Sequence, residues 1–289
     1  MVIRQLASRP RLLGAAVALA LTLGAAGCSD DSGSAARPAS STTTAAVVGS
    51  TTTTPTATLH ILVTNDDGVG APGIDAIVEA LRKLPATEVT VVAPATNQSG
   101  TDGKTTPGTL TVTDASTASG YAAKSVQGYP ADTIVWAIDQ HGVAAPPDLV
   151  VSGINLGQNV GPLADISGTV GAAKAAAKRG IPALAASQGF GDGAPTADFP
   201  SGVKQVIDWV QTHRGDLAGK GPGTSPASVW DMNVPTCPTG SVRGVVTTAL
   251  STATTSTAKV DCTSTKSSFT DDIDAYVNGM AAIAPVPLG

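Results

Sequence analysis

From residue 59 onward, short apolar segments alternate with segments of helical period, and this alternation constrains the fold more than any other feature. The run LHILVT at 59–64 has the nearly continuous apolar character of a strand buried on both faces. A second strand, rich in β-branched residues, is predicted at 89–93 and ends at Pro94. Between them, after a turn rich in Gly and Pro, apolar residues recur at helical spacing, namely Ile74, Ile77, Val78, Leu81 and Leu84.

The same alternation continues along the next part of the chain. It predicts further strands at 148–151 and 181–187, and helices at 131–140, 168–179 and 199–213. Strands separated by helices of this size indicate an α/β fold with a doubly wound, mostly parallel sheet.

Beyond Gly215 the pattern changes to short strands, which we expect at 229–234, 242–250 and 276–285. We therefore predict one domain, residues 59–289, whose doubly wound core carries a β-rich C-terminal extension. Two cysteines lie in this extension, Cys237 and Cys262. Outside the cytoplasm they are free to form a disulfide, and two unpaired buried thiols are the alternative.

The first 58 residues predict export and a tether rather than a folded core. Three arginines precede the apolar stretch 12–26, which ends in small residues, and this order is typical of a secretory signal peptide over 1–27. A buried core helix is the alternative, but the run is terminal and is followed at once by acidic residues. The segment Ala25-Ala26-Gly27-Cys28 resembles a bacterial lipobox, in which Cys28 is acylated. Residues 28–58, rich in Ser, Thr, Ala and Pro, are predicted to be a disordered linker.

Composition excludes several classes of function. The net charge of −5 argues against a basic nucleic-acid-binding surface, and only 3% of residues are aromatic. Because the only long apolar run is the N-terminal one, a polytopic membrane protein is excluded. We expect an extracytoplasmic protein, a cell-membrane lipoprotein or else a secreted protein, that meets the membrane only through a lipid anchor at Cys28.

Polar side chains follow three of the predicted strands, at the point where each strand ends. The segments are NDDG at 65–68, NQSG at 97–100 and SGIN at 152–155, the last followed by Gly157, Asn159 and Gly161. In open α/β sheets, ligands bind outside the carboxyl ends of the strands. We therefore expect the functional site at this edge of the sheet.

The adjacent carboxylates of Asp66 and Asp67 are the most informative pair at that edge. Two carboxylates so close to each other either share a proton or bind a cation. Oxygen ligands suit Mg²⁺, Mn²⁺ or Ca²⁺ better than zinc, and Ser99 and Asn155 could complete the set. The alternative is a plain turn in which one Asp caps the helix that begins near Gly73.

A possible anion site follows at 167–170, SGTV, which opens an Ala-rich helix. Ser167 or Thr169 could simply cap this helix, but free N–H groups at a helix start also bind anions. Beside a divalent cation, such a site suits phosphoryl transfer. The segment 68–73, GVGAPG, matches a dinucleotide-binding fingerprint, but the two carboxylates before it would repel a pyrophosphate, so we disfavour that interpretation.

These segments together resemble the SurE (survival protein E) family over residues 59–288. The motifs that carry the resemblance are ILVTNDDG at 61–68, APG at 71–73, VAP at 92–94, NQSG at 97–100, VSGINLG at 151–157, SGTV at 167–170, MNVP at 232–235, TDDIDAY at 270–276 and IAP at 283–285. The pair Ala95-Thr96 stands where the family commonly has Asp-Arg, and GYPAD at 128–132 replaces the usual GTPxD.

The resemblance implies a metal-dependent phosphatase that acts on nucleoside monophosphates, a 5′/3′-nucleotidase, in some members with short polyphosphate as a substrate. It implies a Rossmann-like core whose C-terminal arm exchanges between subunits, and hence a homodimer or homotetramer. The family's metal ligands correspond to Asp66, Asp67, Ser99 and Asn155, which would hold one divalent cation per subunit, Mg²⁺ or Mn²⁺.

We therefore expect hydrolysis of a phosphate monoester by a metal-activated water, with Asp66, Asp67 and Asn65 at the catalytic centre. The phosphate would be held by Asn159, Ser167, Gly168 and Thr169. Two alternatives remain: a non-catalytic lipoprotein that captures nucleotides or phosphate, and a polyphosphatase.

Overall fold

The structure, a computed structural model, describes residues 57–191, 197–253 and 259–289. All of them belong to one of the two contact units of the chain, Thr54–Gly289. The predicted signal peptide at 1–27 and the predicted linker at 28–58, except for its last two residues, lie outside the described residues. Both stay predictions.

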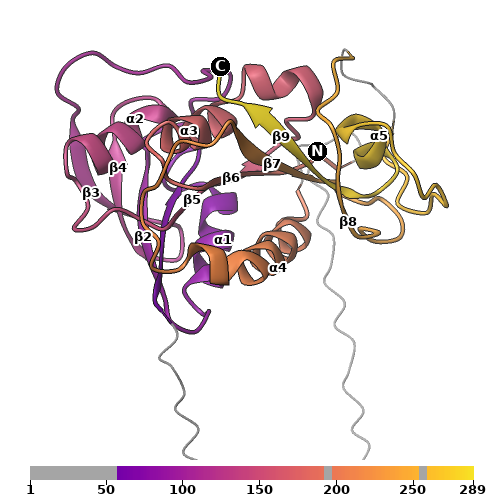
Figure 1. The fold of residues 1–289 in the computed structure, drawn as a ribbon, viewed down its shortest axis with the longest axis horizontal. Helices are drawn as coiled ribbons and strands as arrows, with labels where there is room; N and C mark the ends of the chain where they lie inside the picture. The colour runs from indigo at the N-terminus through magenta and orange to yellow at the C-terminus, as the bar shows by residue number, and fades with distance from the viewer. Residues whose placement is uncertain (1–56, 192–196, 254–258) are drawn as a thin grey trace, which may run out of the picture. The chain divides into compact units, whose positions relative to one another are not determined.

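A nine-stranded sheet organises the described chain, with the strand order β3-β4-β2-β1-β5-β6-β7-β9-β8 (Figure 1). The strands are β1 Leu59–Thr64, β2 Thr87–Pro94, β3 Val112–Ser116, β4 Ala122–Val126, β5 Leu149–Leu156, β6 Ala183–Gln188, β7 Ser228–Val234, β8 Val245–Thr247 and β9 Ala281–Pro287. The central strands β2, β1, β5, β6 and β7 are parallel, whereas β3 pairs with β4 and β7 with β9 in antiparallel fashion. The predicted doubly wound, mostly parallel α/β fold is confirmed.

Helices cover both faces of this sheet (Figure 1). On one face lie α1 Pro72–Leu81 and α4 Phe199–Leu217, and on the other lie α2 Pro130–Ile134, which continues as a π-helical turn at Val135–Asp139, and α3 Gly168–Ala177. Strand β1 shows why the chain folds in this way. Ile61 and Val63 pack into the core under α1 and α4, while Leu62 between them packs into the core under α3. A strand with apolar side chains on both faces requires such two-sided cover.

The structure differs from the sequence prediction in several elements. Of the strand predicted at 242–250 only β8, Val245–Thr247, forms, and the strand predicted at 148–151 continues to Leu156, so that the SGIN segment lies inside β5. The hairpin of β3 and β4 was not predicted, because its strands have only five residues each and no apolar alternation marks them. The strand predicted at 276–285 begins only at Ala281, and the residues before it form α5, Asp272–Val277. The Asp271 side chain accepts a hydrogen bond from the backbone N–H of Asp274 and thereby starts this helix.

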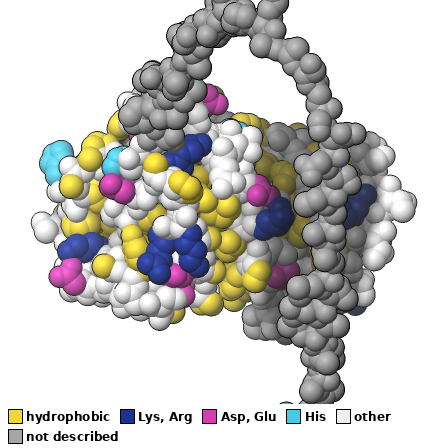
Figure 2. Space-filling model, turned by 90° about the horizontal axis from the view of Figure 1, so that it is seen from below, with side chains coloured by type: hydrophobic (Ala, Val, Ile, Leu, Met, Phe, Trp, Pro, Cys, Tyr) yellow, Lys and Arg dark blue, Asp and Glu magenta, His cyan; other side chains and the backbone are white. Residues whose placement is uncertain are grey.

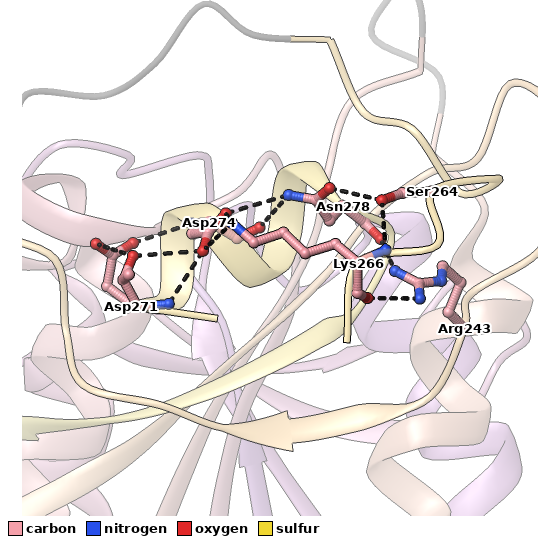
Figure 3. Close-up of polar contacts among 7 residues, drawn as sticks. Arg243, Ser264, Lys266, Asp271, Asp274 and Asn278 are labelled. Carbon is pink, nitrogen blue, oxygen red and sulfur yellow. Dashed lines mark hydrogen bonds and ion pairs between the residues drawn. The ribbon is translucent and has the colours of Figure 1, made fainter. Parts of the chain in front are cut away.

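The segment between β7 and β9, residues 235–280, is called the C-terminal arm here. A disulfide joins Cys237, at the start of the arm, to Cys262, so the paired alternative for these two cysteines is the one the structure shows. Polar contacts tie the loop after Cys262 to α5 (Figure 3). The Lys266 ammonium donates to both carboxylate oxygens of Asp274, at 2.7 and 2.8 Å, and Arg243 donates to the Asn278 and Lys266 carbonyls.

Charges on the α1 and α4 side of the sheet are mixed rather than gathered into one basic patch. Figure 2 shows small groups of Lys and Arg interspersed with acidic and apolar side chains. Among the helices of the described residues, none has both the length and the apolar character that a membrane span needs.

Removal of the disulfide is expected to destabilise the arm. Because the bond closes a loop of 25 residues, Cys262→Ser should lower the free energy of unfolding by about 3 kcal/mol, through the larger entropy of the unfolded chain. Urea unfolding with and without reductant measures this effect. Reductant should lower the midpoint of the wild type to that of the variant and leave the variant unchanged. A midpoint of the wild type that does not respond to reductant would contradict the prediction.

Candidate functional site

Three loops meet at the carboxyl ends of β1, β2 and β5, and Asp67 connects them. One oxygen of its carboxylate, Oδ1, accepts a hydrogen bond from Asn97 Nδ2 at 3.0 Å, and the other, Oδ2, accepts one from the backbone N–H of Leu156 at 3.0 Å. The backbone carbonyl of Asp66 also accepts from the N–H of Gln98, at 2.7 Å. The polar segments that we expected at this edge therefore lie together and are joined by hydrogen bonds.

Asp66 lies deeper, with 2% of its surface exposed, against the start of α3. Its Oδ1 accepts a hydrogen bond from Thr169 Oγ1 at 2.7 Å. Burial raises the pKa of Asp66 to about 6; the Thr169 hydroxyl opposes this shift and the charge of Asp67 adds to it. Burial also raises the pKa of Asp67, and the Leu156 N–H opposes this. Desolvation is thus the main cost at both carboxylates, and the neighbouring charge adds to it at Asp66.

The structure brings a third ligand candidate, Asn155, to the same edge through an irregularity in β5. The register of β5 against β6 shifts between Ser152 and Asn155, and Gly153 adopts φ +143° there. A side chain at Gly153 would place its Cβ 2.3 Å from the Ala186 carbonyl oxygen, so this bend requires glycine. Asn155 Nδ2 donates to the Gly157 carbonyl at 2.7 Å, which leaves its Oδ1 as the free end of the amide.

The residues present fit a hard divalent cation. The Asn155 Oδ1 and Ser99 Oγ atoms have no hydrogen-bond partner among the described residues, and both are oxygens of the kind that ligate such a cation. Ser99 is exposed on the loop whose Asn97 contacts Asp67. In the described part of the chain, no group of three or more His, Cys, Asp or Glu side chains could hold a metal. Two carboxylates together with neutral oxygens are a donor set that suits Mg²⁺ or Mn²⁺.

The start of α3 faces the same carboxylates. Ser167 caps the helix, and its Oγ accepts from the Val170 N–H at 3.2 Å. A Cβ at Gly168 would lie 2.9 Å from Asp66 Cβ, so the absence of a side chain lets the helix start approach the acid closely. Capping by Ser167 is thus shown by the structure, and the anion site at this helix start stays a prediction.

Asn65 occupies a different position from the other predicted site residues. Its side chain is fully buried, its Nδ2 donates to the Gly68 carbonyl at 2.9 Å, and its Oδ1 accepts from the Gly68 N–H at 3.2 Å. Both ends of the amide thus close the turn that presents Asp66 and Asp67. In this arrangement Asn65 shapes the site, and a direct catalytic role stays a prediction.

Asn159 belongs to a buried polar network behind the site. Its N–H donates to Asn233 Oδ1 at 2.6 Å, and its side-chain Nδ2 donates to Ser187 Oγ at 2.9 Å. Asn233 Nδ2 in turn donates to Asp231 Oδ2 at 2.9 Å. Burial raises the pKa of Asp231 to about 8, the nearby Asp272 adding to the shift, so at neutral pH this acid is mainly protonated.

The comparisons with known proteins agree with this geometry. The profile of the family described as Survival protein SurE matches residues 61–257 of this chain. The chain belongs to the SurE family. It is 45% identical over 165 residues to a protein named 5′-nucleotidase SurE from Methanopyrus kandleri, which covers 54% of this chain and 62% of that protein.

Two further SurE relatives extend the match. A protein of the same name from Azorhizobium caulinodans is 35% identical over 195 residues, 66% of this chain and 71% of its own length. The crystal structure of the SurE protein from Aquifex aeolicus superposes with a TM-score of 0.62 at 25% identity, over 80% of this chain and 94% of that one. The match to a solved SurE structure extends through most of both chains.

Two residues at the SurE site carry structural roles that the sequence prediction did not assign. Asn97 orients Asp67, and Asn233 holds the loop that carries Asn159. Both lie inside motifs of the family resemblance, NQSG and MNVP, which was the available signal. Their partners, 30 and 74 residues away along the chain, could not be read from spacing.

The Thr169 hydroxyl is expected to control the ionisation of Asp66. Its hydrogen bond favours the carboxylate, so Thr169→Val should raise the pKa of Asp66 above about 6. Protons compete with a cation for the carboxylate, and the pH midpoint of cation binding should rise with that pKa. An NMR titration of the Asp66 carboxyl in the metal-free protein measures the shift.

Thr133→Val is the matched control, because Thr133 is also buried but bonds to Thr64 and the Pro130 carbonyl instead. An Asp66 midpoint that moves equally in both variants, or in neither, would contradict the assignment.

Proposed function

We propose that this protein is a divalent-metal-dependent phosphomonoester hydrolase that releases phosphate from nucleoside monophosphates, a 5′/3′-nucleotidase. The observation that carries the proposal is the position of the buried Asp66 and the half-buried Asp67 at the sheet edge, with Asp66 against the start of α3 and Asp67 bonded to the loops after β2 and β5. The names of the curated relatives, 5′-nucleotidase SurE, support the same activity.

Asp66, Asp67, Ser99 and Asn155 would hold one Mg²⁺ or Mn²⁺ per subunit. When bound, the cation would polarise the phosphate ester and lower the pKa of a coordinated water. The chain's own part is to fix the ligands: Asn97 and the Leu156 N–H orient Asp67, and Thr169 orients Asp66. Such contacts hold the carboxylate oxygens in fixed positions.

Phosphate would be held at the start of α3, where Ser167, Gly168 and Thr169 offer N–H groups and the positive end of the helix dipole. Asn159 would contribute from the loop after β5. Its side-chain Nδ2 donates one N–H to Ser187 Oγ, so only the second N–H of the same amide is left for a phosphate. We therefore give the helix start the larger part in binding.

A cavity of about 420 Å³ on the other side of Asp67 offers room for the nucleoside. Its lining is mostly apolar or backbone, and includes Gly68, Gly70, Leu156 and Phe199. Phe199 and Leu156 offer apolar surface to a planar base, and the Asp67 carboxylate and backbone groups supply the polar part of the lining.

The central test is phosphate release from AMP with Mn²⁺ or Mg²⁺. Asp66→Asn keeps the size of the side chain but removes the charge that holds the cation. We expect kcat/KM to fall by at least about 10³-fold, since outer partners of a metal alone typically account for 10- to 100-fold. A chelator should abolish the wild-type activity.

Asp114→Asn is the control, because Asp114 lies on β3 in an exposed ion pair with Lys124. Its activity should equal that of the wild type. Tight nucleotide binding without turnover in any divalent metal would instead favour the capture lipoprotein. Faster release from short polyphosphate than from AMP would favour the polyphosphatase.

We propose further that the protein is an extracytoplasmic lipoprotein anchored by acylated Cys28, and that it forms a homodimer or homotetramer. The apolar stretch 12–26 and the lipobox-like segment before Cys28 support export, and the disulfide in the arm suits an oxidising compartment.

Replacement of the anchoring cysteine is expected to release the protein from the membrane. In Cys28→Ser the acceptor thiol is lost, and the mature protein should appear in the soluble fraction of a bacterial host rather than with the membranes. Detergent partitioning and mass spectrometry of the mature N-terminus measure this. Membrane retention of Cys28→Ser at the level of the unsubstituted protein would contradict lipidation at this residue.

A further inference from the structure

Residues 155–161, called the 155–161 loop here, run from the last two residues of β5 to the start of the 3-10 helix at Gly161–Asp165. This segment carries both Asn155 and Asn159, and four backbone N–H groups fix it. Leu156 donates to Asp67 Oδ2, Gly157 to the Gln188 carbonyl at 2.8 Å, and Asn159 to Asn233. The fourth donor is Gly161, whose N–H reaches Asp272 Oδ2 at 2.7 Å. Three anchors come from the strand ends, and the last comes from the C-terminal arm, 111 residues farther along the chain.

The Asp272 carboxylate bridges two backbone segments. Its side chain is fully buried in the first turn of α5, and its Oδ1 accepts from the Ser251 N–H at 2.7 Å while Oδ2 accepts from Gly161. Its own N–H donates to the Ala249 carbonyl at 3.0 Å. A single side chain therefore joins the arm's helix, the segment after β8 and the loop of the site.

Apolar contacts between the loop and α5 add to these hydrogen bonds. Val160, next to Gly161 in the loop, belongs to a small core with Ile273, Ala275 and Tyr276 of α5 and Ala282 of β9. A Cβ at Gly161 would lie 2.8 Å from Ile273 Cδ1, so the loop backbone packs directly on the arm. The position of the loop is thus set by the arm as much as by the sheet.

We propose that Asp272 is a positioning residue through which the C-terminal arm sets the geometry of the 155–161 loop and thereby the affinity of the site for its cation. This inference rests on the proposed function only in assuming that Asn155 is a ligand of the cation. Asp272 itself touches neither substrate nor cation, and acts through the backbone of Gly161.

The carboxylate is needed at this position for a specific chemical reason. Two N–H groups point at it, one at each oxygen, and an ionised carboxylate accepts both. Asparagine has one acceptor oxygen and one NH₂ group, so in Asp272→Asn one N–H donor would face another donor. The loop or the segment at Ser251 must then move away from α5.

The experiment titrates Mn²⁺ into purified metal-free protein by isothermal titration calorimetry. Because loss of a partner that orients a metal ligand typically weakens metal binding about 10- to 100-fold, we expect that increase in the Kd for Mn²⁺ in Asp272→Asn. Phosphate release from AMP should fall at low Mn²⁺ and recover toward the wild-type kcat when Mn²⁺ is saturating. A general loss of folded protein would lower kcat at every metal concentration and leave the Kd unchanged.

Asp274→Asn is the matched control, since it removes the same charge from the same short helix. Asp274 faces Lys266 and Thr270 on the outside of α5 (Figure 3), and it makes no hydrogen bond to the 155–161 loop. Its Kd for Mn²⁺ should equal that of the wild type. Equal Kd values for Asp272→Asn and Asp274→Asn, in folded protein, would overturn the proposal.

A second substitution, Asp272→Glu, covers the case in which Asp272→Asn does not fold. It retains both acceptor oxygens but lengthens the side chain by one methylene, so we expect a folded protein with a smaller increase in the Kd. Wild-type affinity in Asp272→Glu, together with an unfolded Asp272→Asn, would show a role in folding alone and reject the proposal. If the wild type binds Mn²⁺ but cleaves no phosphate monoester, the nucleotidase proposal fails, and the calorimetric comparison still decides the role of Asp272.

Discussion

Desolvation of the Asp66 carboxylate, which lies buried beside the half-buried Asp67, is the constraint around which the site is arranged. A chain does not bury an acid beside a second acid at the end of an apolar strand without compensation, because desolvation, and at Asp66 the neighbouring charge, disfavour the ionised form. Burial raises the pKa of both carboxyl groups. The proposed divalent cation would offset this cost, because an opposite charge favours the ionised form of each acid.

The fold meets the same constraint with neutral hydrogen-bond donors rather than with basic side chains. Thr169 and the start of α3 face Asp66, and Asn97 and the Leu156 N–H face Asp67. An arginine in their place would pair with the carboxylates and compete with a cation. Neutral donors orient the oxygens and leave their charge available. The doubly wound topology makes this possible, since it brings three strand ends and one helix start to a single edge.

Much of this arrangement was predictable, because it depends on local pattern. The apolar run at 59–64 marked the position of β1, and the polar segments after β1 and β2 and at the end of β5 indicated where Asp66, Ser99 and Asn155 would lie. The β3–β4 hairpin and α5 were not predictable, since elements of five and six residues are too short to show an apolar period and depend on tertiary contacts. For the same reason the roles of Asn233 and Asp272 came only from the structure. Each acts on a loop that lies far away in sequence.

The arm therefore has two connections to the site that differ in kind. The disulfide between Cys237 and Cys262 limits the conformations that the unfolded arm can adopt. The contacts of Lys266 and Arg243 hold the outer loop of the arm, but neither they nor the disulfide touch the 155–161 loop. Asp272 and Ile273 do touch it. The disulfide and the contacts of Lys266 and Arg243 stabilise the folded arm. The contacts of Asp272 and Ile273 fix the position of the 155–161 loop, and with it the positions of Asn155 and Asn159. An extension that adds only three short elements to the sheet edge can in this way determine the geometry of a site built on the central strands.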